Sequence, residues 1–266
     1  MRIVTLIENL SYKQNLVGEH GLSIYIETDK KKILFDAGQS GLFVNNAKYM
    51  GIDLSQVDDV VISHGHYDHT GGLYAFLKEN KKAKIHIKES AFQNKYRGQE
   101  KYIGFPYNIN LFEDRFNFIT EITQIDDEIY IIPEIEIFNE EDTHFTNMKI
   151  KNRYTVKEDE FTDEQFILIK NSSEISIITG CSHRGITNII ETGKKESDLP
   201  INLIMGGFHF DKEEDEKIKK IINYFESINP KKIGFSHCSG IEAFSLFKER
   251  MKDKVFYNYT GNEIRI

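Results

Sequence analysis

Cysteine and tryptophan are scarce in this chain of 266 residues, which contains two cysteines and no tryptophan. Two cysteines cannot build the disulfide framework of a small secreted domain, so we expect a reducing compartment and a cytoplasmic protein. A disulfide between Cys181 and Cys238 is not expected in such a compartment. The missing tryptophan excludes no class of protein.

Long apolar runs and an excess of basic residues are missing as well. No run approaches the roughly 18 apolar residues that a membrane-spanning helix needs, and the first residues lack the continuous apolar core of a signal peptide. The 34 basic residues against 42 acidic ones give a net charge of -8, which disfavours a broad face for nucleic acid. We therefore expect neither a membrane nor a nucleic acid as partner, and the oligomeric state stays open.

Strands and helices alternate along the chain. Short β-branched runs predict strands, and apolar residues at helical spacing predict helices. The predicted strands are 2–7, 22–27, 31–35, 58–62, 84–87, 128–138, 165–169, 175–179, 201–205, 232–235 and one near 255, and the predicted helices are 41–50, 73–79, 90–96, 184–192, 212–227 and 241–250. The second half repeats the outline of the first, which indicates an α/β protein.

The alternation breaks down from about residue 97 to residue 117. This stretch mixes glycine, proline, aromatic and basic residues without a period, which predicts either an inserted lid or a plain surface excursion. With this insertion, residues 1–266 are expected to form one domain. A lid would offer a substrate rings and positive charge, although the rings could instead pack onto the fold: Arg97, Tyr102, Phe105 and Tyr107, beside Lys95 and Lys101.

Three histidines and a carboxylate lie within six residues of one another. They belong to the string Ser63-His64-Gly65-His66-Tyr67-Asp68-His69-Thr70-Gly71-Gly72, which follows the predicted strand 58–62. Neutral imidazoles and a carboxylate on one tight loop are ligands for a divalent metal ion. The string, which we call the signature loop, therefore predicts a metal site.

Further ligands are expected at other strand ends. His183, His209 and His237 each follow a β-rich run and precede a helix, and such strand ends are where α/β folds gather their sites. His209 is also compatible with a role beside the metal or in substrate binding. His86, inside a strand, and His144, in an acidic stretch, have no such context.

With these motifs the chain resembles the metallo-β-lactamase superfamily of metal-dependent hydrolases over nearly its whole length. Leu34-Phe35-Asp36-Ala37-Gly38 and His237 belong to the resemblance together with the signature loop. It implies a four-layer αββα sandwich. Residues 19–23, 180–185 and 206–209 are similar to one subgroup, the 7,8-dihydropterin-6-methyl-4-(β-D-ribofuranosyl)-aminobenzene-5'-phosphate synthases.

The resemblance also implies a dinuclear site with two divalent metal ions, zinc or else manganese or iron. The ligands that it implies are His64, His66 and His183 for one ion, and Asp68, His69 and His237 for the other. Cys181 stands where most relatives carry a bridging aspartate, so either hydroxide alone joins the ions or Cys181 replaces the carboxylate. Asp36 is expected to be a buried acceptor that fixes the signature loop, with direct metal binding as the alternative.

Such a site implies a hydrolase in which hydroxide attacks an ester, lactone or phosphoester of a small substrate. Asp68 would orient the hydroxide, and His209 or His20 would stabilise the anion or protonate the leaving group, while Arg184 would pair with a phosphate. The alternative is a synthase that condenses a dihydropterin with an aminobenzene ribofuranosyl phosphate, so the substrate is either a phosphorylated or a pterin-like small molecule. A redox diiron protein, a nuclease and a catalytically silent metal-binding module are less favoured.

Overall fold

The computed structural model describes residues 1–106 and 113–266. The contacts between Cα atoms divide the chain into two compact units. The first unit comprises residues 1–120, 145–164 and 259–266, and the second comprises residues 121–144 and 165–258. Among the described residues, no helix has the length and apolar character to cross a membrane.

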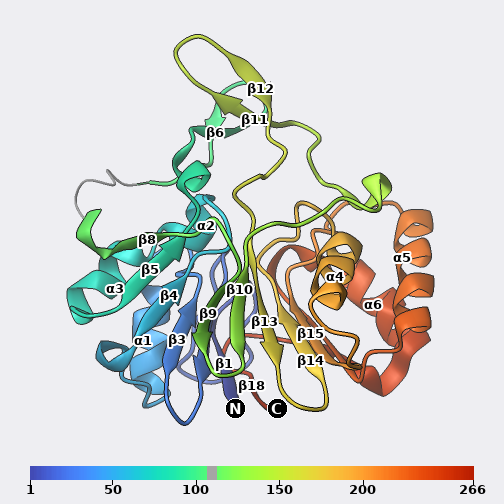
Figure 1. Ribbon diagram of the computed structural model, residues 1–266, viewed down its shortest axis with the longest axis horizontal. Helices are drawn as coiled ribbons and strands as arrows, with labels where there is room; N and C mark the ends of the chain where they lie inside the picture. Colours follow the sequence, from blue (N-terminus) through green and yellow to red (C-terminus); the bar gives the residue numbers. More distant parts are fainter. Residues whose placement is uncertain (107–112) are drawn as a thin grey trace. The chain divides into compact units, whose positions relative to one another are not determined.

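The first unit contains a seven-stranded sheet in the order β18-β1-β2-β3-β4-β5-β8. Its strands are β1 (Arg2–Ile7), β2 (Ser23–Glu27), β3 (Lys32–Phe35), β4 (Asp59–Val61), β5 (Lys84–Ile87), β8 (Phe116–Phe118) and β18 (Glu263–Arg265). β3, β4, β5 and β8 run parallel, whereas β18, β1, β2 and β3 pair antiparallel. Helices α1 (Leu42–Tyr49) and α3 (Leu73–Glu79) flank this sheet, and their Phe43 and Phe76 are fully buried in its core (Figure 1).

A second, four-stranded sheet of the first unit has the order β12-β11-β6-β7. Its strands are β6 (Lys95–Arg97), β7 (Lys101–Tyr102), β11 (Met148–Lys151) and β12 (Val156–Glu158). The predicted helix at 90–96 is therefore wrong: a 3₁₀ turn at Glu89–Phe92 precedes β6, which pairs with β11. Pairing with a strand more than fifty residues away outweighs the local helical spacing.

The second unit is built around another seven-stranded sheet, in the order β17-β16-β15-β14-β13-β10-β9. Its strands are β9 (Thr123–Asp126), β10 (Ile129–Ile132), β13 (Phe166–Lys170), β14 (Ile175–Ile178), β15 (Ile201–Gly206), β16 (Lys232–Phe235) and β17 (Val255–Tyr257). β14 to β17 run parallel and the other pairs antiparallel. The predicted strand 128–138 ends early, at Ile132, because Pro133 has no amide proton for the ladder.

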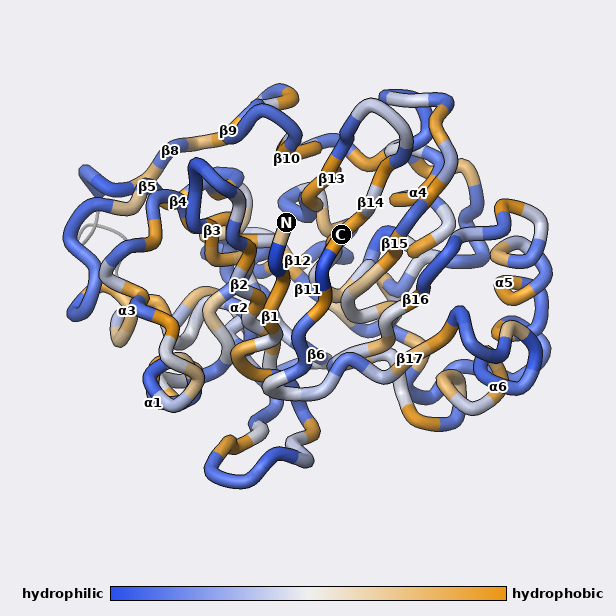
Figure 2. The backbone as a smooth tube through the Cα atoms, turned by 90° about the horizontal axis from the view of Figure 1, so that it is seen from below, coloured by the Kyte–Doolittle hydropathy of each residue, from blue (hydrophilic) through white to orange (hydrophobic). Residues whose placement is uncertain are grey.

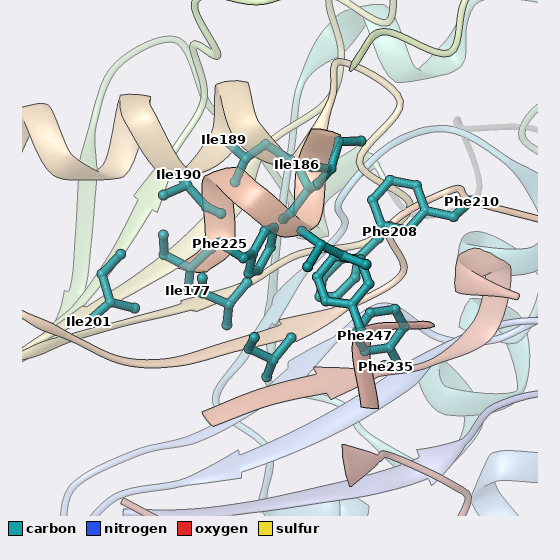
Figure 3. Packing of buried hydrophobic residues seen from close by; sticks show 14 of the residues in the cluster. Ile177, Ile186, Ile189, Ile190, Ile201, Phe208, Phe210, Phe225, Phe235 and Phe247 are labelled. Atoms are coloured by element: carbon teal, nitrogen blue, oxygen red, sulfur yellow. The ribbon is translucent and has the colours of Figure 1, made fainter. Parts of the chain in front are cut away.

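Three helices, α4 (Ile186–Lys195), α5 (Asp215–Ile228) and α6 (Ile241–Met251), cover this sheet (Figure 1). Ile186, Ile189 and Ile190 of α4 lie in one apolar cluster with Phe225 of α5 and Phe247 of α6 (Figure 3). Hydrophobic residues follow β13 and β14 along the backbone in Figure 2. The predicted α/β class is confirmed, whereas one domain with an inserted lid stays a prediction.

Candidate metal centre

The signature loop lies at the carboxyl end of β4, in the first unit. His64, His66 and His69 are buried, and the ring centroid of His64 lies 4.6 Å from that of His66 and 4.3 Å from that of His69. The short helix α2 (Tyr67–Thr70) carries Asp68 and His69. The structure thus brings the three histidines of this loop together.

Asp36, at the end of the neighbouring parallel strand β3, holds the signature loop in place. Its carboxylate accepts hydrogen bonds from the Ser63 backbone N–H (2.7 Å), from the Ser63 hydroxyl (2.7 Å) and from Nδ1 of His69 (2.6 Å). Because the Ser63 proton points to Asp36, Nδ1 of His64, 2.9 Å from the Ser63 oxygen, must donate to it. One buried carboxylate therefore leaves the lone pair of both His64 and His69 on Nε2, the form that binds metal.

The electrostatics of the loop favour neutral histidines. Burial, together with the charges that His69 and His66 would carry, holds the pKa of His64 well below its usual range. A neutral imidazole at pH 7 offers a lone pair to a cation, whereas a protonated one repels it.

A buried ion triad supports the same loop from the side of the four-stranded sheet. Lys95, 1 % exposed, donates to Asp159 (2.7 Å) and to Asp163 (2.8 Å), and Asp163 also accepts from the Gly65 backbone N–H (2.8 Å). The ring of Phe161 lies below the ammonium at 4.9 Å and packs edge-on against His66, with centroids 5.3 Å apart. The segment 159–163 thus connects β6 to the His-Gly-His turn.

His20 and Asp68 form an ion pair at the edge of the signature loop. Nε2 of His20 lies 3.0 Å from the Asp68 carboxylate, and the His20 side chain is about half exposed. The Leu22 backbone N–H donates to the Asp68 carbonyl, so the 20–22 segment is attached directly to α2. An exposed imidazole beside a carboxylate is an arrangement that can take up and deliver a proton.

In the second unit, the candidate residues lie at the carboxyl ends of three parallel strands. Cys181 and His183 follow β14, His209 follows β15, and His237 and Cys238 follow β16. The potential ligand atoms of Cys181, His183 and His209 lie within 4.8 Å of one another, and so do those of Cys181, His237 and Cys238. Neither Cys181 nor Cys238 takes part in a disulfide.

Residues at the strand ends of both units have backbones in the left-handed region. Their φ angles are 58° at Asp36, 56° at Ser182, 55° at His209 and 56° at His237. Such angles are rare for residues other than glycine, and they concentrate at functional sites because the surrounding structure must hold them. The backbone strain is a separate observation from the histidine motifs of the sequence, and it occurs at the same strand ends.

His144, for which no role was predicted from the sequence, supports the loop of His183. The backbone N–H of His144 donates to the His183 carbonyl (2.8 Å), and its ring lies against that of His209, with centroids 5.0 Å apart. Glu213 accepts from Nδ1 of His144 (3.0 Å), and burial lowers the pKa of His144 to about 4. A neutral His144 thus packs at a tilt against His209, whose ring in turn lies 4.4 Å from that of His183.

Asp142 caps the helix that follows His183. It accepts hydrogen bonds from the backbone N–H and the hydroxyl of Thr187, both at 2.7 Å, in the first turn of α4. Burial of this carboxylate raises its pKa to about 6, and its other oxygen has no hydrogen-bond partner among the described residues.

Cys238 lies in a crowded corner of the strand ends. A Cβ added to Gly207 would come within 2.6 Å of its sulfur, so the thiol occupies space that any larger residue would take. Burial alone would raise the pKa of Cys238, but hydrogen bonds with Cys181 and His209 and the charge of His237 hold it well below its usual range.

The residues predicted to bind substrate are scattered. Tyr102 is exposed on β7, where its hydroxyl donates to the Phe105 carbonyl, and Arg97 is exposed at the end of β6. Phe105 is 5 % exposed and packs against Phe92, so packing accounts for its ring. In the second unit, Nε of Arg184 donates to the Ile135 carbonyl, and Tyr107 lies outside the described residues.

Lys95 differs most from its sequence interpretation. Its interpretation as a positive charge that a substrate could meet beside the lid rings is wrong, because its ammonium is buried between two carboxylates. The pattern that could have revealed it is the pair Asp159 and Asp163, which sit four residues apart around Phe161, far along the chain from Lys95.

The chain is similar to known proteins over most or all of its length. Residues 16–153 match the family described as the metallo-beta-lactamase superfamily. An uncharacterized protein of Methanocaldococcus jannaschii, MJ0448, is 35% identical over 99% of this chain and all of its own length. The 7,8-dihydropterin-6-methyl-4-(beta-D-ribofuranosyl)-aminobenzene-5'-phosphate synthase of that organism is 29% identical over 100% of this chain and 96% of its own.

A solved structure shows the same likeness. The crystal structure of Tm1679, a metal-dependent hydrolase of the beta-lactamase superfamily, has a TM-score of 0.88 and 31% identity, and the match covers 100% of this chain and 99% of that one. This match over the whole length confirms the predicted α/β sandwich.

Proposed function

We propose, because this chain belongs to the metallo-beta-lactamase superfamily, that it is a metal-dependent hydrolase of a small ester, lactone or phosphoester. The proposed cofactors are two divalent metal ions, zinc first, with manganese or iron as alternatives. The proposed ligands are His64, His66, Asp68 and His69 of the first unit, and His183 and His237 of the second.

The observation that carries this proposal is the hydrogen-bond chain of Asp36. A carboxylate that directs the Nδ1 protons of two neighbouring buried histidines, His64 through Ser63 and His69 directly, prepares two Nε2 lone pairs for a cation. A purely structural histidine cluster has no need for this common tautomer. When bound, divalent ions lower the pKa of water toward neutrality and polarise the oxygen of an electrophile.

The chain's own groups supply the remaining chemistry in this proposal. Asp68 holds the exposed His20 at 3.0 Å, and His20 delivers a proton to the leaving group from its ring. In the second unit, His209 is held by a left-handed backbone and by the ring contact with His144, and it stabilises negative charge on the substrate.

The test uses purified protein loaded separately with zinc, manganese or iron(II) and assayed on a nitrophenyl ester, a lactone and a phosphodiester. We expect turnover of at least one substrate, loss of turnover on chelation and recovery when the metal is restored. His64→Asn should lower turnover to the level of the chelated protein, whereas His86→Asn, which changes a histidine paired with Asp59, should not. No turnover by protein that holds two ions per chain would contradict the proposal.

A second function is favoured by one observation, the likeness to the synthase of Methanocaldococcus jannaschii over the whole chain. We accordingly propose as the alternative a synthase that joins a dihydropterin to an aminobenzene ribofuranosyl phosphate. Incubation of both compounds with the metal-loaded protein, followed by mass spectrometry, separates the two functions. A condensed product without ester hydrolysis would favour the synthase, and hydrolysis without a condensed product would exclude it.

A further inference from the structure

Two thiols and an imidazole, which are ligands that zinc prefers over oxygen, lie together in the second unit. Sγ of Cys181, Sγ of Cys238 and a ring nitrogen of His237 all lie within 4.8 Å of one another. In a tetrahedral zinc site, with bonds of about 2.3 Å to sulfur and about 2.0 Å to nitrogen, ligand atoms are about 3.3 to 3.8 Å apart. The upper bound of 4.8 Å on the distances between the three atoms is therefore about 1 Å above the spacing that one such ion needs.

The backbone around these donors is shaped to bring them together. Cys181 and Cys238 follow the parallel strands β14 and β16, on either side of β15. The Gly207 position, directly after β15, leaves the room that the Cys238 sulfur occupies, because a Cβ there would lie 2.6 Å from it. His237 is held at a φ of 56° in the 3₁₀ turn that also contains Cys238.

Hydrogen bonds between the strand ends fix the same arrangement. The Ser239 hydroxyl donates to the Ser236 carbonyl (2.8 Å) and accepts from the Phe208 backbone N–H (3.0 Å). The Ser182 hydroxyl donates to the Gly207 carbonyl (2.7 Å). The loops that carry the two thiols are thus both tied to the segment 206–208.

We propose that Cys181, Cys238 and His237 form a thiolate-rich site for one thiophilic divalent ion of the zinc class. The inference deepens the proposed function, on which it rests for the presence of a second ion. Thiolate ligands select zinc, cobalt or cadmium over manganese and magnesium, which prefer oxygen ligands. The second ion of this chain is then selected by sulfur, through two thiolates in addition to His237.

The chain offers a clean spectroscopic test, because it contains only these two cysteines. Metal-free protein is titrated with cobalt(II), and absorption is recorded in the near ultraviolet, where charge transfer from thiolate to cobalt occurs, and in the visible, where any bound cobalt absorbs. We expect a near-ultraviolet band in the wild type, about half of it in Cys181→Ser and in Cys238→Ser, and none in the double variant. Visible absorption without the near-ultraviolet band would overturn the proposal, and so would a full band in either single variant.

X-ray absorption at the zinc edge of the wild-type protein decides the matter if a variant does not fold. Zinc bound by two thiolates shows a sulfur shell at about 2.3 Å, whereas a site without thiolates shows only nitrogen and oxygen at about 2.0 to 2.1 Å. The sulfur shell would support the proposal and its absence would overturn it. A thiolate band in protein that hydrolyses nothing would contradict the proposed function and support the thiolate site. Turnover in protein without the band would support the proposed function and contradict the thiolate site.

Discussion

Asp36 and His69 are joined by a hydrogen bond of 2.6 Å between Oδ2 and Nδ1, at the buried ends of β3 and the signature loop. In Asp36→Asn, one carboxylate oxygen becomes an NH2 group, which donates and cannot accept. The single remaining oxygen cannot accept both from the Ser63 backbone N–H and from Nδ1 of His69, so the proton of His69 moves toward Nε2 and the metal-binding lone pair is lost. We expect the zinc affinity to fall by about 10- to 100-fold, measured by competition with a chromophoric chelator.

The matched control for this change is Asp59→Asn. Asp59 accepts from Nε2 of His86 at 2.8 Å, so the variant alters a carboxylate–histidine pair of the same sheet that does not involve the signature loop. Its zinc affinity should equal that of the wild type. Equal affinities in both variants would show that Asp36 has no role in preparing the histidines.

Lys95→Met should destabilise the fold strongly. The change leaves the carboxylates of Asp159 and Asp163 buried without their cation, and such a loss costs about 3–5 kcal/mol of unfolding free energy. Lys31→Met removes the partly exposed partner of Asp59 and should cost less than about 1 kcal/mol. Urea unfolding followed by circular dichroism measures both, and similar losses in the two variants would contradict a buried triad.

Gly65→Ala tests the packing of the His-Gly-His turn. A Cβ at this position would lie 1.9 Å from the Ala91 carbonyl oxygen, so the turn must shift and the three histidines lose their common geometry. We expect zinc binding by calorimetry to weaken at least about tenfold, in line with the loss of ligand support. Gly51→Ala, where no heavy atom lies within 4 Å, carries only the strain of a positive φ and should bind zinc normally. Unchanged binding in Gly65→Ala would show that the loop tolerates the shift.

Asp142→Asn should change how stability depends on pH. The pKa of Asp142 is raised by burial to about 6, above its ordinary value of 3.8, so its ionisation weakens the wild-type fold as the pH rises through this window. Asparagine keeps an oxygen for Thr187 and does not ionise. The variant should therefore gain stability relative to the wild type between about pH 4 and pH 6, by on the order of 3 kcal/mol, and keep this difference above pH 6.

Urea unfolding at a series of pH values tests this, with Glu141→Gln as the control. Glu141 is an exposed neighbour whose pKa is lowered by its hydrogen bond with Lys220, so its removal should act in the opposite direction and only weakly. A stability difference between Asp142→Asn and the wild type that does not vary with pH would contradict a raised pKa of Asp142.

The sequence predicts well wherever local pattern and tertiary structure agree. The helix at 73–79 and the strands at 84–87 and 232–235 have the predicted bounds, because buried apolar residues recur at the spacing of one element. The four strands of the small sheet depend on pairing between residues 95–102 and 148–158, which no local pattern reveals. Lys95 was misjudged for the same reason, since its partners are distant in sequence.

The candidate site divides along similar lines. The signature loop is visible in the sequence because its three histidines and Asp68 lie within six residues, and Asp36 is found through a motif. His144 has no neighbouring motif, and only the fold places its ring beside His209. From the sequence, Cys238 is interpreted as a small buried residue. Only the fold, through β14 and β16, places its sulfur within 4.8 Å of that of Cys181.

The left-handed backbones at Ser182, His209 and His237 limit how this protein can be engineered for heat resistance. Glycine relieves about 1 to 2 kcal/mol of strain at each such position, so a screen that rewards survival at high temperature alone would favour it there. The surviving variants would keep the fold but lose the imidazoles of His209 and His237 at the strand ends. A thermostability library for this chain should therefore keep these three codons constant and seek its gains in the helices on the outer faces.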